Sequence, residues 1–347
     1  MTRCTKCILP ETYPEIAFDS KGVCNYCHQY EPIKYLGRDN LNSVLNRYRR
    51  NDDQPDCLVA VSGGRDSTYV LYQLRETFGM RPLAFNYNNG FVSDPAQKNI
   101  EMMTQKLDIP LVSVSSRRGI QEKMFKSFLE FNARKSPAHV LNQICVGCRH
   151  GIWGGAYKTA AERGIQLLVF GESKIESMVF RRILAQRLEP QLSDKVETTL
   201  KMPVNFLRRK LQERRLNREF PLIQERYRPI LKINYFDYIE WNEDEIVNTL
   251  RGIGWQADQQ NTWRFDCQIH ALGNYLNQQL YGFTEKDELY SRMIREGLSD
   301  RQSALHKVET AQQNRKTELD TIETLMRTAK IKPRIADALL DVQAIAS

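Results

Sequence analysis

The sequence contains no apolar run long enough to cross a membrane, and its first residues lack the apolar stretch of a signal peptide. Its longest apolar runs, such as Leu58 to Val61 and Leu167 to Phe170, are far shorter than the roughly 18 residues that a membrane-spanning helix needs. Internal repeats and low-complexity segments are also missing, which excludes fibrous and repeat architectures. These absences predict a cytoplasmic protein without membrane insertion.

A large excess of one charge is missing as well. The 347 residues carry 50 Lys and Arg against 42 Asp and Glu, a net charge of +8, and 41% of them are hydrophobic. This composition is typical of one large or two ordinary globular domains, and the charge suits an anionic ligand without separating nucleotide from nucleic acid. The segment from Phe180 to Lys232 is the most basic, with 14 basic residues against six acidic ones. This basic segment is either a solvated helical face or a surface that binds phosphate or pyrophosphate.

Six of the eight cysteines form three CxxC pairs, which favours metal ligands or reactive thiols over disulfides in a chain without a secretory signal. The first two pairs, separated by sixteen residues, have the spacing of a zinc ribbon, in which four thiolates bind one Zn²⁺. We expect residues 1–35 to form such a segment, with a short β-hairpin between the pairs and with zinc supplying the folding energy. The predicted ligands are Cys4, Cys7, Cys24 and Cys27.

Residues 36–180 alternate between strand-like apolar runs and segments of helical spacing, which predicts an α/β fold with a doubly wound, mostly parallel sheet. Ligands of such sheets bind beyond the carboxyl ends of the strands. Residues 181–347 are expected to form a basic, mainly helical region for substrate or partner, with a capping box at Ser299 to Gln302. The expected strands are 58–61, 81–87, 110–114 and 166–170, and the expected helices are 40–50, 66–78, 95–107 and 151–163.

A glycine turn follows the first expected strand of the sheet directly and opens the next helix. In this run, SGGRDS from Ser62 to Ser67, two glycines let a phosphate approach the backbone, and the helix N-terminus offers unpaired N–H donors. The run differs from the GxxxxGK[ST] motif, because no Lys-Ser or Lys-Thr pair closes it. It therefore predicts a phosphate-binding loop of another type.

The run resembles the SGGxDS fingerprint of the PP-loop ATP pyrophosphatase superfamily, whose members have a HUP-like sheet, cleave ATP between the α- and β-phosphates and transfer AMP to a substrate oxygen. Members usually carry Lys where Arg65 stands. The resemblance implies ATP and Mg²⁺ as ligands, although Asn86 also fits an ordinary turn and Glu172 a helix cap. The nucleotide-binding candidates are Ser62, Gly63, Gly64, Asp66, Ser67 and Asn86, and the catalytic candidates are Arg65, Asp66, Glu172 and Lys174.

The order of motifs along most of the chain resembles the N-acetyl sugar amidotransferase family of bacterial surface-polysaccharide, including lipopolysaccharide, assembly. By this resemblance, the enzyme adenylates the acetamido oxygen of a nucleotide-linked sugar, and ammonia from a separate glutaminase subunit displaces AMP. The motifs are the two N-terminal CxxC pairs, the SGGRDS run, Cys145 to Cys148, Val169 to Glu172, and Ile294 to Leu305.

The last three cysteines favour an alternative. Cys145, Cys148 and Cys267 resemble the three-thiolate arrangement of cluster-dependent tRNA thiolation enzymes, in which a [4Fe-4S] cluster keeps one iron open for sulfide. Sulfur insertion into tRNA or a small molecule is therefore the second candidate function. The same cysteines also fit a second metal site or reduced structural thiols. A third candidate, a non-enzymatic zinc-ribbon protein that binds nucleic acid, leaves the SGGRDS run without a role.

Overall fold

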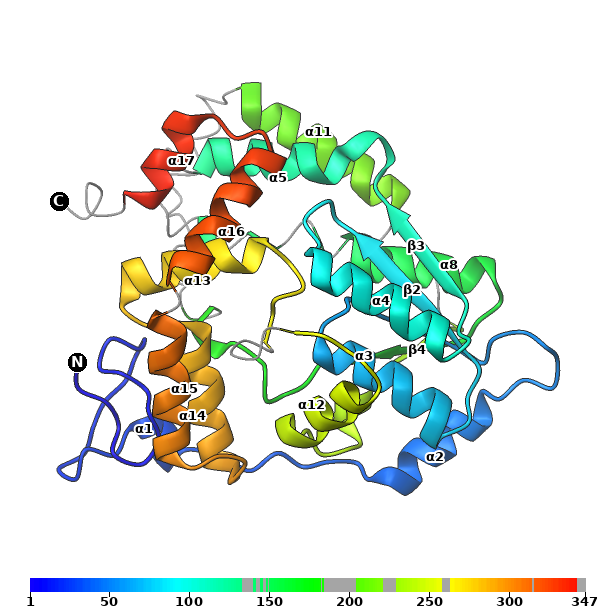
Figure 1. Ribbon diagram of the computed structural model, residues 1–347, viewed down its shortest axis with the longest axis horizontal. Coiled ribbons are helices and arrows are strands. Elements are labelled where there is room, and N and C mark those ends of the chain that lie inside the picture. The colour runs from blue at the N-terminus through cyan, green and yellow to red at the C-terminus, as the bar shows by residue number, and fades with distance from the viewer. Residues whose placement is uncertain are drawn as a thin grey trace.

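A parallel sheet of five strands lies at the centre of the molecule (Figure 1). The strands follow the order β3-β2-β1-β4-β5, and all neighbours are parallel. The chain reaches one edge through β2 and β3 and then returns to the other side of β1, which places the topological switch point between β1 and β4. The computed structural model describes residues 1–132, 140–141, 144–145, 148, 150–181, 183, 204–220, 229–257, 263–313 and 315–341.

The elements of the described chain have the following bounds. The strands are β1 (Cys57–Ala60), β2 (Pro82–Asn88), β3 (Leu111–Ser115), β4 (Leu167–Phe170) and β5 (Leu231–Asn234). Up to β5, the helices are α1 (Asn25–His28), α2 (Arg38–Arg47), α3 (Arg65–Tyr72) with its π-helical continuation η1 (Gln73–Thr77), α4 (Asp94–Lys106), η2 (Arg117–Gly119), α5 (Ile120–Asn132), η3 (His150–Gly154), α8 (Gly155–Glu162) and α11 (Val204–Glu219). Beyond β5 they are η5 (Tyr235–Asp237), α12 (Glu243–Gly252), α13 (Ile269–Tyr281), α14 (Glu285–Glu296), α15 (Arg301–Gln313), α16 (Arg315–Thr328) and α17 (Pro333–Leu340).

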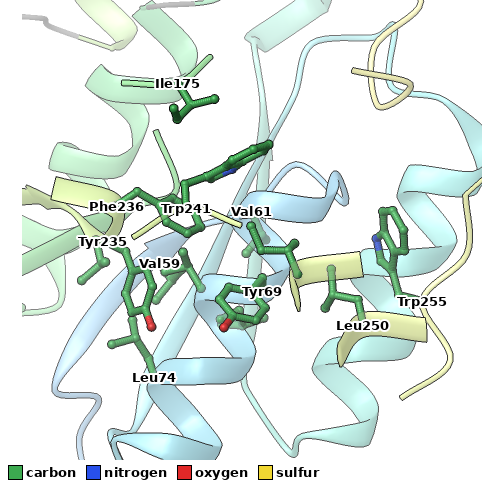
Figure 2. Close-up of a cluster of buried hydrophobic side chains, with 14 of the residues drawn as sticks. Val59, Val61, Tyr69, Leu74, Ile175, Tyr235, Phe236, Trp241, Leu250 and Trp255 are labelled. Carbon is green, nitrogen blue, oxygen red and sulfur yellow. The ribbon is translucent and has the colours of Figure 1, made fainter. Parts of the chain in front are cut away.

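Both faces of the sheet are buried, because successive side chains of each strand point to opposite sides. Val59 and Val169 pack with α3 and α12 on one face, where Figure 2 shows Trp241 among the surrounding side chains. Leu58 and Leu168 pack with α8 and α11 on the other face. Strands buried on both faces are continuous apolar runs in the sequence, which explains why the apolar pattern predicted them.

The predicted fold class is confirmed: a parallel α/β sheet with helices, a group of four N-terminal cysteines and a helical C-terminal region. β1 to β4 begin and end within one residue of their expected bounds. The sequence pattern missed α5 and the edge strand β5. The division into three regions stays a prediction. Two elements of the third expected region belong to the sheet domain: β5 pairs with β4, and α12 packs against α3.

Two local expectations were wrong. The expected hairpin of the N-terminal segment is reduced to isolated antiparallel bridges, from Arg3 to Pro10 and from Phe18 to Cys24, which are too short to form strands. The expected capping box at Ser299 is replaced by a cap on Asp300, whose carboxylate accepts from the backbone N–H of Ser303 at 2.9 Å, directly before α15.

The basic segment is described only in part, since residues 182, 184–203 and 221–228 lie outside the described residues. Within it, α11 packs against α5, near the C-terminal helices α16 and α17 in the upper part of Figure 1. None of the helices in the described chain is both long and apolar enough to cross a membrane.

Helix α14 carries charged side chains that are almost completely out of water. Arg292 donates to the carbonyl oxygens of Lys174 and Ser177, at 2.5 and 2.7 Å, and to the Glu288 carboxylate at 2.9 Å. Glu288 also accepts from the backbone N–H of Val179 at 2.8 Å. Helix α14 therefore holds the segment that follows β4. Its buried charged residues are Glu285, Asp287, Glu288 and Arg292.

Replacing Arg292 with Met should destabilise the fold, because it leaves Glu288 buried without its cation and removes donors from the carbonyls after β4. Loss of one partner of a buried pair costs about 3–5 kcal/mol, which a urea unfolding curve would measure. Arg251→Met, at an exposed position of α12, should shift the curve little. Adding Glu288→Gln to Arg292→Met should restore part of the loss. A small effect of Arg292→Met itself would show that α14 does not hold the segment.

Candidate active site

The glycine loop lies at the switch point of the sheet, between β1 and α3. Gly63 has a φ of +81°, and a Cβ there would meet the carbonyl oxygen of Ala96 at 2.1 Å. The Gly63 carbonyl accepts from Trp255 Nε1 at 3.0 Å and from Asn99 Nδ2 at 3.2 Å. Only glycine fits this position, and the loop backbone is fixed where it packs against Ala96 and Trp255.

The two serines of the run shape the loop. Ser67 Oγ accepts from the Ser62 backbone N–H at 3.1 Å, and Ser62 Oγ accepts from the Gly64 N–H at 3.3 Å. Gly64 is the N-cap of α3, and a Cβ on Gly171, just after β4, would lie 2.9 Å from the Ser67 backbone nitrogen. The end of β4 and the first turn of α3 therefore lie in contact, and the N–H groups of that turn have no partner within the helix.

Arg65 and Asp66 belong to a buried cluster of charges at the start of α3. The Arg65 side chain is 2% exposed and pairs with Glu243 and, at 2.8 Å, with Glu176, while its Cζ lies 5.0 Å from the centroid of the Trp241 ring. Asp66 Oδ1 accepts from Trp241 Nε1 at 2.9 Å. Burial, and then the charge of Glu176, raises the pKa of Asp66 well above its ordinary value. Both residues anchor the start of α3 in the core, and their catalytic roles stay predictions.

Asn86, a nucleotide-binding candidate, lies inside the sheet. Its side chain is buried in β2, where Nδ2 donates to the Val61 carbonyl at 2.9 Å and Oδ1 accepts from Ser113 Oγ at 3.3 Å. Both ends of the amide therefore connect β2 to its neighbours.

Glu172 and Lys174, the other catalytic candidates, follow β4 at the edge where the glycine loop lies. Glu172 accepts from Lys232 Nζ at 3.0 Å and from Trp153 Nε1 at 3.2 Å. Lys174 Nζ lies 3.8 Å from Asp237 Oδ1. Both side chains are about half exposed, 46% for Glu172 and 54% for Lys174, so both are open to a ligand.

The four N-terminal cysteines converge into one buried group whose sulfur atoms all lie within 4.8 Å of one another. The sulfurs of Cys4 and Cys27 are 3.9 Å apart and those of Cys7 and Cys24 are 3.8 Å apart. Four thiolates at 2.3 Å from one tetrahedral Zn²⁺ are about 3.8 Å apart, whereas a disulfide needs about 2.05 Å. The geometry thus fits the predicted zinc ligands.

The C-terminal motif of the amidotransferase resemblance packs against this group. Arg301 donates to the carbonyl oxygens of Cys4 and Cys7, at 3.2 and 3.0 Å, and Arg295 Nη1 lies 3.7 Å from the Cys7 sulfur. Gly297 ends α14 with a φ of +76°. In Figure 1, α14 and α15 lie beside the N-terminal segment. The segment with the four cysteines therefore packs with α14 and α15 as one unit, and Arg295 and Arg301 lie directly next to the cysteines.

The last three cysteines also approach one another. Asn89 Nδ2 lies 3.5 Å from both the Cys148 and the Cys267 sulfur, so these sulfurs lie within twice that distance of each other. The Cys148 backbone N–H donates to the Cys145 carbonyl at 3.1 Å. Burial, and then the charge of Cys145, raises the pKa of Cys148 to about 12. The structure brings these candidates together just beyond the carboxyl end of β2.

Several residues near the glycine loop were missed by the sequence reasoning. Glu176 and Glu243 pair with Arg65, and Trp241 donates to Asp66. Asp266 Oδ2 lies 3.2 Å from the position that a Cβ on Gly64 would take. No motif marks these residues, and only the position of Asp266 next to Cys267 could have drawn attention to it. The missed residues are Glu176, Trp241, Glu243 and Asp266.

The sheet, its loop and the cysteine groups define an α/β protein with a glycine loop between β1 and α3 and a four-cysteine site that fits a metal. No protein-family model matches the sequence. The chain is 25% identical over 114 residues to the uncharacterized protein MJ1599 of Methanocaldococcus jannaschii, and the matched region covers 32% of this chain and 41% of that protein. The chain thus spans less than half the length of this relative.

A solved structure to which the chain is similar is the U34-tRNA thiolase NcsA from Methanococcus maripaludis with its [4Fe-4S] cluster. The TM-score is 0.36 and the sequence identity 14%, and the match covers 88% of this chain and 89% of that chain. These values are too low to assign the chain to a family, so its function is inferred from its own residues.

Gly63→Ala should weaken ATP binding, because the new Cβ would collide with the Ala96 carbonyl and force the loop out of its left-handed conformation. We expect the affinity measured by calorimetry to fall at least about tenfold, or about 1.4 kcal/mol. Gly252→Ala is the matched control, since a Cβ there meets nothing within 4 Å. Equal affinities of the two folded variants would exclude the glycine loop as the ATP site.

Cys24→Ser should remove tightly bound zinc and lower the urea midpoint, since it takes one of four ligands from a segment with little core of its own. The loss in zinc affinity should exceed the roughly 10- to 100-fold that removal of an outer-shell partner costs. Cys57→Ala, at a buried cysteine of β1, should leave the zinc content unchanged. A wild-type protein that is folded and free of zinc would contradict the assignment.

Proposed function

We propose that the chain is an ATP-dependent, AMP-forming enzyme that activates a carbonyl oxygen of its substrate. The observation that carries the proposal is the Gly63–Gly64 loop, where only glycine fits and where the first turn of α3 begins. This loop lies at the switch point, the position at which doubly wound sheets bind nucleotides.

The residues of the loop suit phosphate binding. Backbone N–H groups of the loop and of the first turn of α3 would hold the β- and γ-phosphates, aided by the hydroxyls of Ser62 and Ser67. Mg²⁺, which accompanies ATP, spreads the negative charge of the phosphates. The buried pair of Arg65 and Glu176 keeps the start of α3 in place, so that these donors are oriented before ATP arrives.

The reaction then has two steps. A substrate carbonyl oxygen attacks the α-phosphorus, the bond to the β-phosphate breaks, and pyrophosphate leaves. A nucleophile next adds to the activated carbonyl carbon, and AMP leaves with the former carbonyl oxygen. Glu172 and Lys174, which are open at the end of β4, are candidates to orient the acceptor.

Nitrogen transfer is the first candidate for the second step. The sequence motifs resemble those of N-acetyl sugar amidotransferases, and the packing of Arg295 and Arg301 against the cysteine segment supports the resemblance by giving its C-terminal motif a structural role. On this proposal, ammonia from a separate glutaminase subunit attacks the adenylated acetamido group of a nucleotide-linked sugar in surface-polysaccharide synthesis.

Sulfur transfer is the second candidate, and one observation favours it. Asn89 brings Cys148 and Cys267 together beyond the end of β2, the strand next to β1 and its glycine loop, with Cys145 close by. These three thiols would hold a [4Fe-4S] cluster, which when bound supplies an open iron for sulfide. The acceptor would then be tRNA or a small molecule.

Cys267→Ala separates the two candidates. If nitrogen is transferred, the variant should still form AMP from ATP with ammonium ion and a nucleotide-linked N-acetyl sugar, at a cost in stability of about 1–2 kcal/mol from lost packing. This is the outcome we expect. Cys57→Ala is the matched control for removal of a cysteine far from the other thiols.

The measurement is AMP and pyrophosphate formation together with iron content after anaerobic purification. Wild-type protein with about four irons, active only with sulfide and inactivated by Cys267→Ala, would establish sulfur transfer instead. A protein that releases no pyrophosphate with either nucleophile would favour the non-enzymatic, nucleic-acid-binding alternative.

A further inference from the structure

A short strap, residues Trp263 to Gln268, connects the glycine loop to the site of the last three cysteines, Cys145, Cys148 and Cys267. The strap runs antiparallel to the segment before α4: Cys267 forms a bridge with Val92, and the Ser93 backbone N–H donates to the Asp266 carbonyl at 3.1 Å. Two neighbouring side chains of the strap contact different sites. Cys267 contacts Asn89, and Asp266 contacts the glycine loop at Gly64. The position of Asp266 is therefore fixed by its backbone on both sides.

The Asp266 carboxylate lies directly against Gly64. Its Oδ2 and Cγ are 3.2 and 3.3 Å from the position that a Cβ on Gly64 would take. Within the described part of the chain, no side chain or backbone group donates a hydrogen bond to this carboxylate or pairs with it. The nearest arginine in the sequence, Arg264, is already paired with Glu285 at 3.0 Å. Arg264 lies close enough for its charge to interact with that of Asp266, but within the described residues no cation forms an ion pair with Asp266. This carboxylate thus borders the loop that is proposed to bind ATP.

A phosphate bound at the loop and the Asp266 carboxylate would repel each other unless a cation lay between them. Mg²⁺ is the cation that suits this arrangement, because it binds through one or two carboxylates together with phosphate oxygens. Asp66, a nucleotide-binding and catalytic candidate from the sequence, is less available to a metal, since Trp241 donates to one of its oxygens and Arg65 lies 3.6 Å from the same oxygen. Asp266 has neither partner.

We propose that Asp266 is a metal-binding residue of the ATP site, which holds the Mg²⁺ that enters with ATP against the glycine loop. The proposal rests on the proposed ATP-dependent function. It makes the strap a shared element of both sites, because the residue that binds the nucleotide's metal is joined by a peptide bond to Cys267.

The test is the affinity for ATP measured by calorimetry, once with Mg²⁺ and once with EDTA, for wild type and Asp266→Asn. Asn keeps the shape of the side chain and removes its charge. Wild type should bind ATP much more tightly with Mg²⁺. In the variant this preference should fall by roughly tenfold or more, the scale on which changes around a metal alter its affinity. Metal-free ATP should bind the variant as well as wild type or better, because the repulsion is gone.

Asp320→Asn, which removes an exposed carboxylate of α16, is the control and should keep the preference of wild type. Two results would overturn the proposal: an Asp266→Asn variant with the Mg²⁺ preference of wild type, or one that loses equal affinity for ATP with and without Mg²⁺. Equal loss would mean that Asp266 only packs against Gly64, because packing affects both forms of ATP alike. Wild type that binds no ATP under either condition would overturn the ATP-dependent function as well.

Asp266→Glu keeps the test decisive if Asp266→Asn does not fold. Its carboxylate is one methylene further from the backbone, so it should keep binding ATP but with a weaker preference for Mg²⁺ than wild type. Circular dichroism establishes that each variant is folded before titration. An Asp266→Glu protein with the full preference of wild type would contradict the placement of the metal at Oδ2.

Discussion

A charge that leaves water needs a partner, and α14 meets this constraint with residues from distant parts of the chain. Asp287 pairs with Arg3 of the N-terminal cysteine segment at 2.6 Å, while Arg292 donates to the carbonyls of the segment after β4. Glu285 pairs with Arg264 of the strap. Because the three α14 side chains are buried and need these partners in place of water, the three segments are held in one arrangement around this helix.

The same compensation continues to the proposed ATP site. The segment after β4, held by α14, carries Glu176, which pairs with Arg65 at the start of α3. A series of charged contacts through α14 thus links the glycine loop to the four N-terminal cysteines, although no sequence motif joins these two sites. This connection links the N-terminal cysteines to the position of the loop, while Asn89 Nδ2 lies 3.5 Å from the sulfurs of both Cys148 and Cys267.

Features that depend on local sequence were predictable. The apolar runs of β1 to β4 specify strands buried on both faces, and the alternation with helices specifies a doubly wound sheet. Gly63 belongs to a turn between strand and helix, where its φ of +81° and the approach of Ala96 exclude any side chain. The spacing of Cys4, Cys7, Cys24 and Cys27 likewise specified a common site, because each CxxC turn brings its own two sulfurs together before the pairs meet.

Other features were decided only by the tertiary structure. β5 is short and its pattern is not distinctive, so its place in the sheet depends on pairing with β4. The sequence made Arg65 a catalytic candidate, and only the structure shows that Glu243, 178 residues away, pairs with it in the core. Asp266 likewise reaches Gly64 from a distant part of the chain. The sequence by itself determined the strands, the loop and the cysteine site through spacing between near neighbours. The partners of each charge were determined by folding, because burial and pairing depend on residues that come together only in three dimensions.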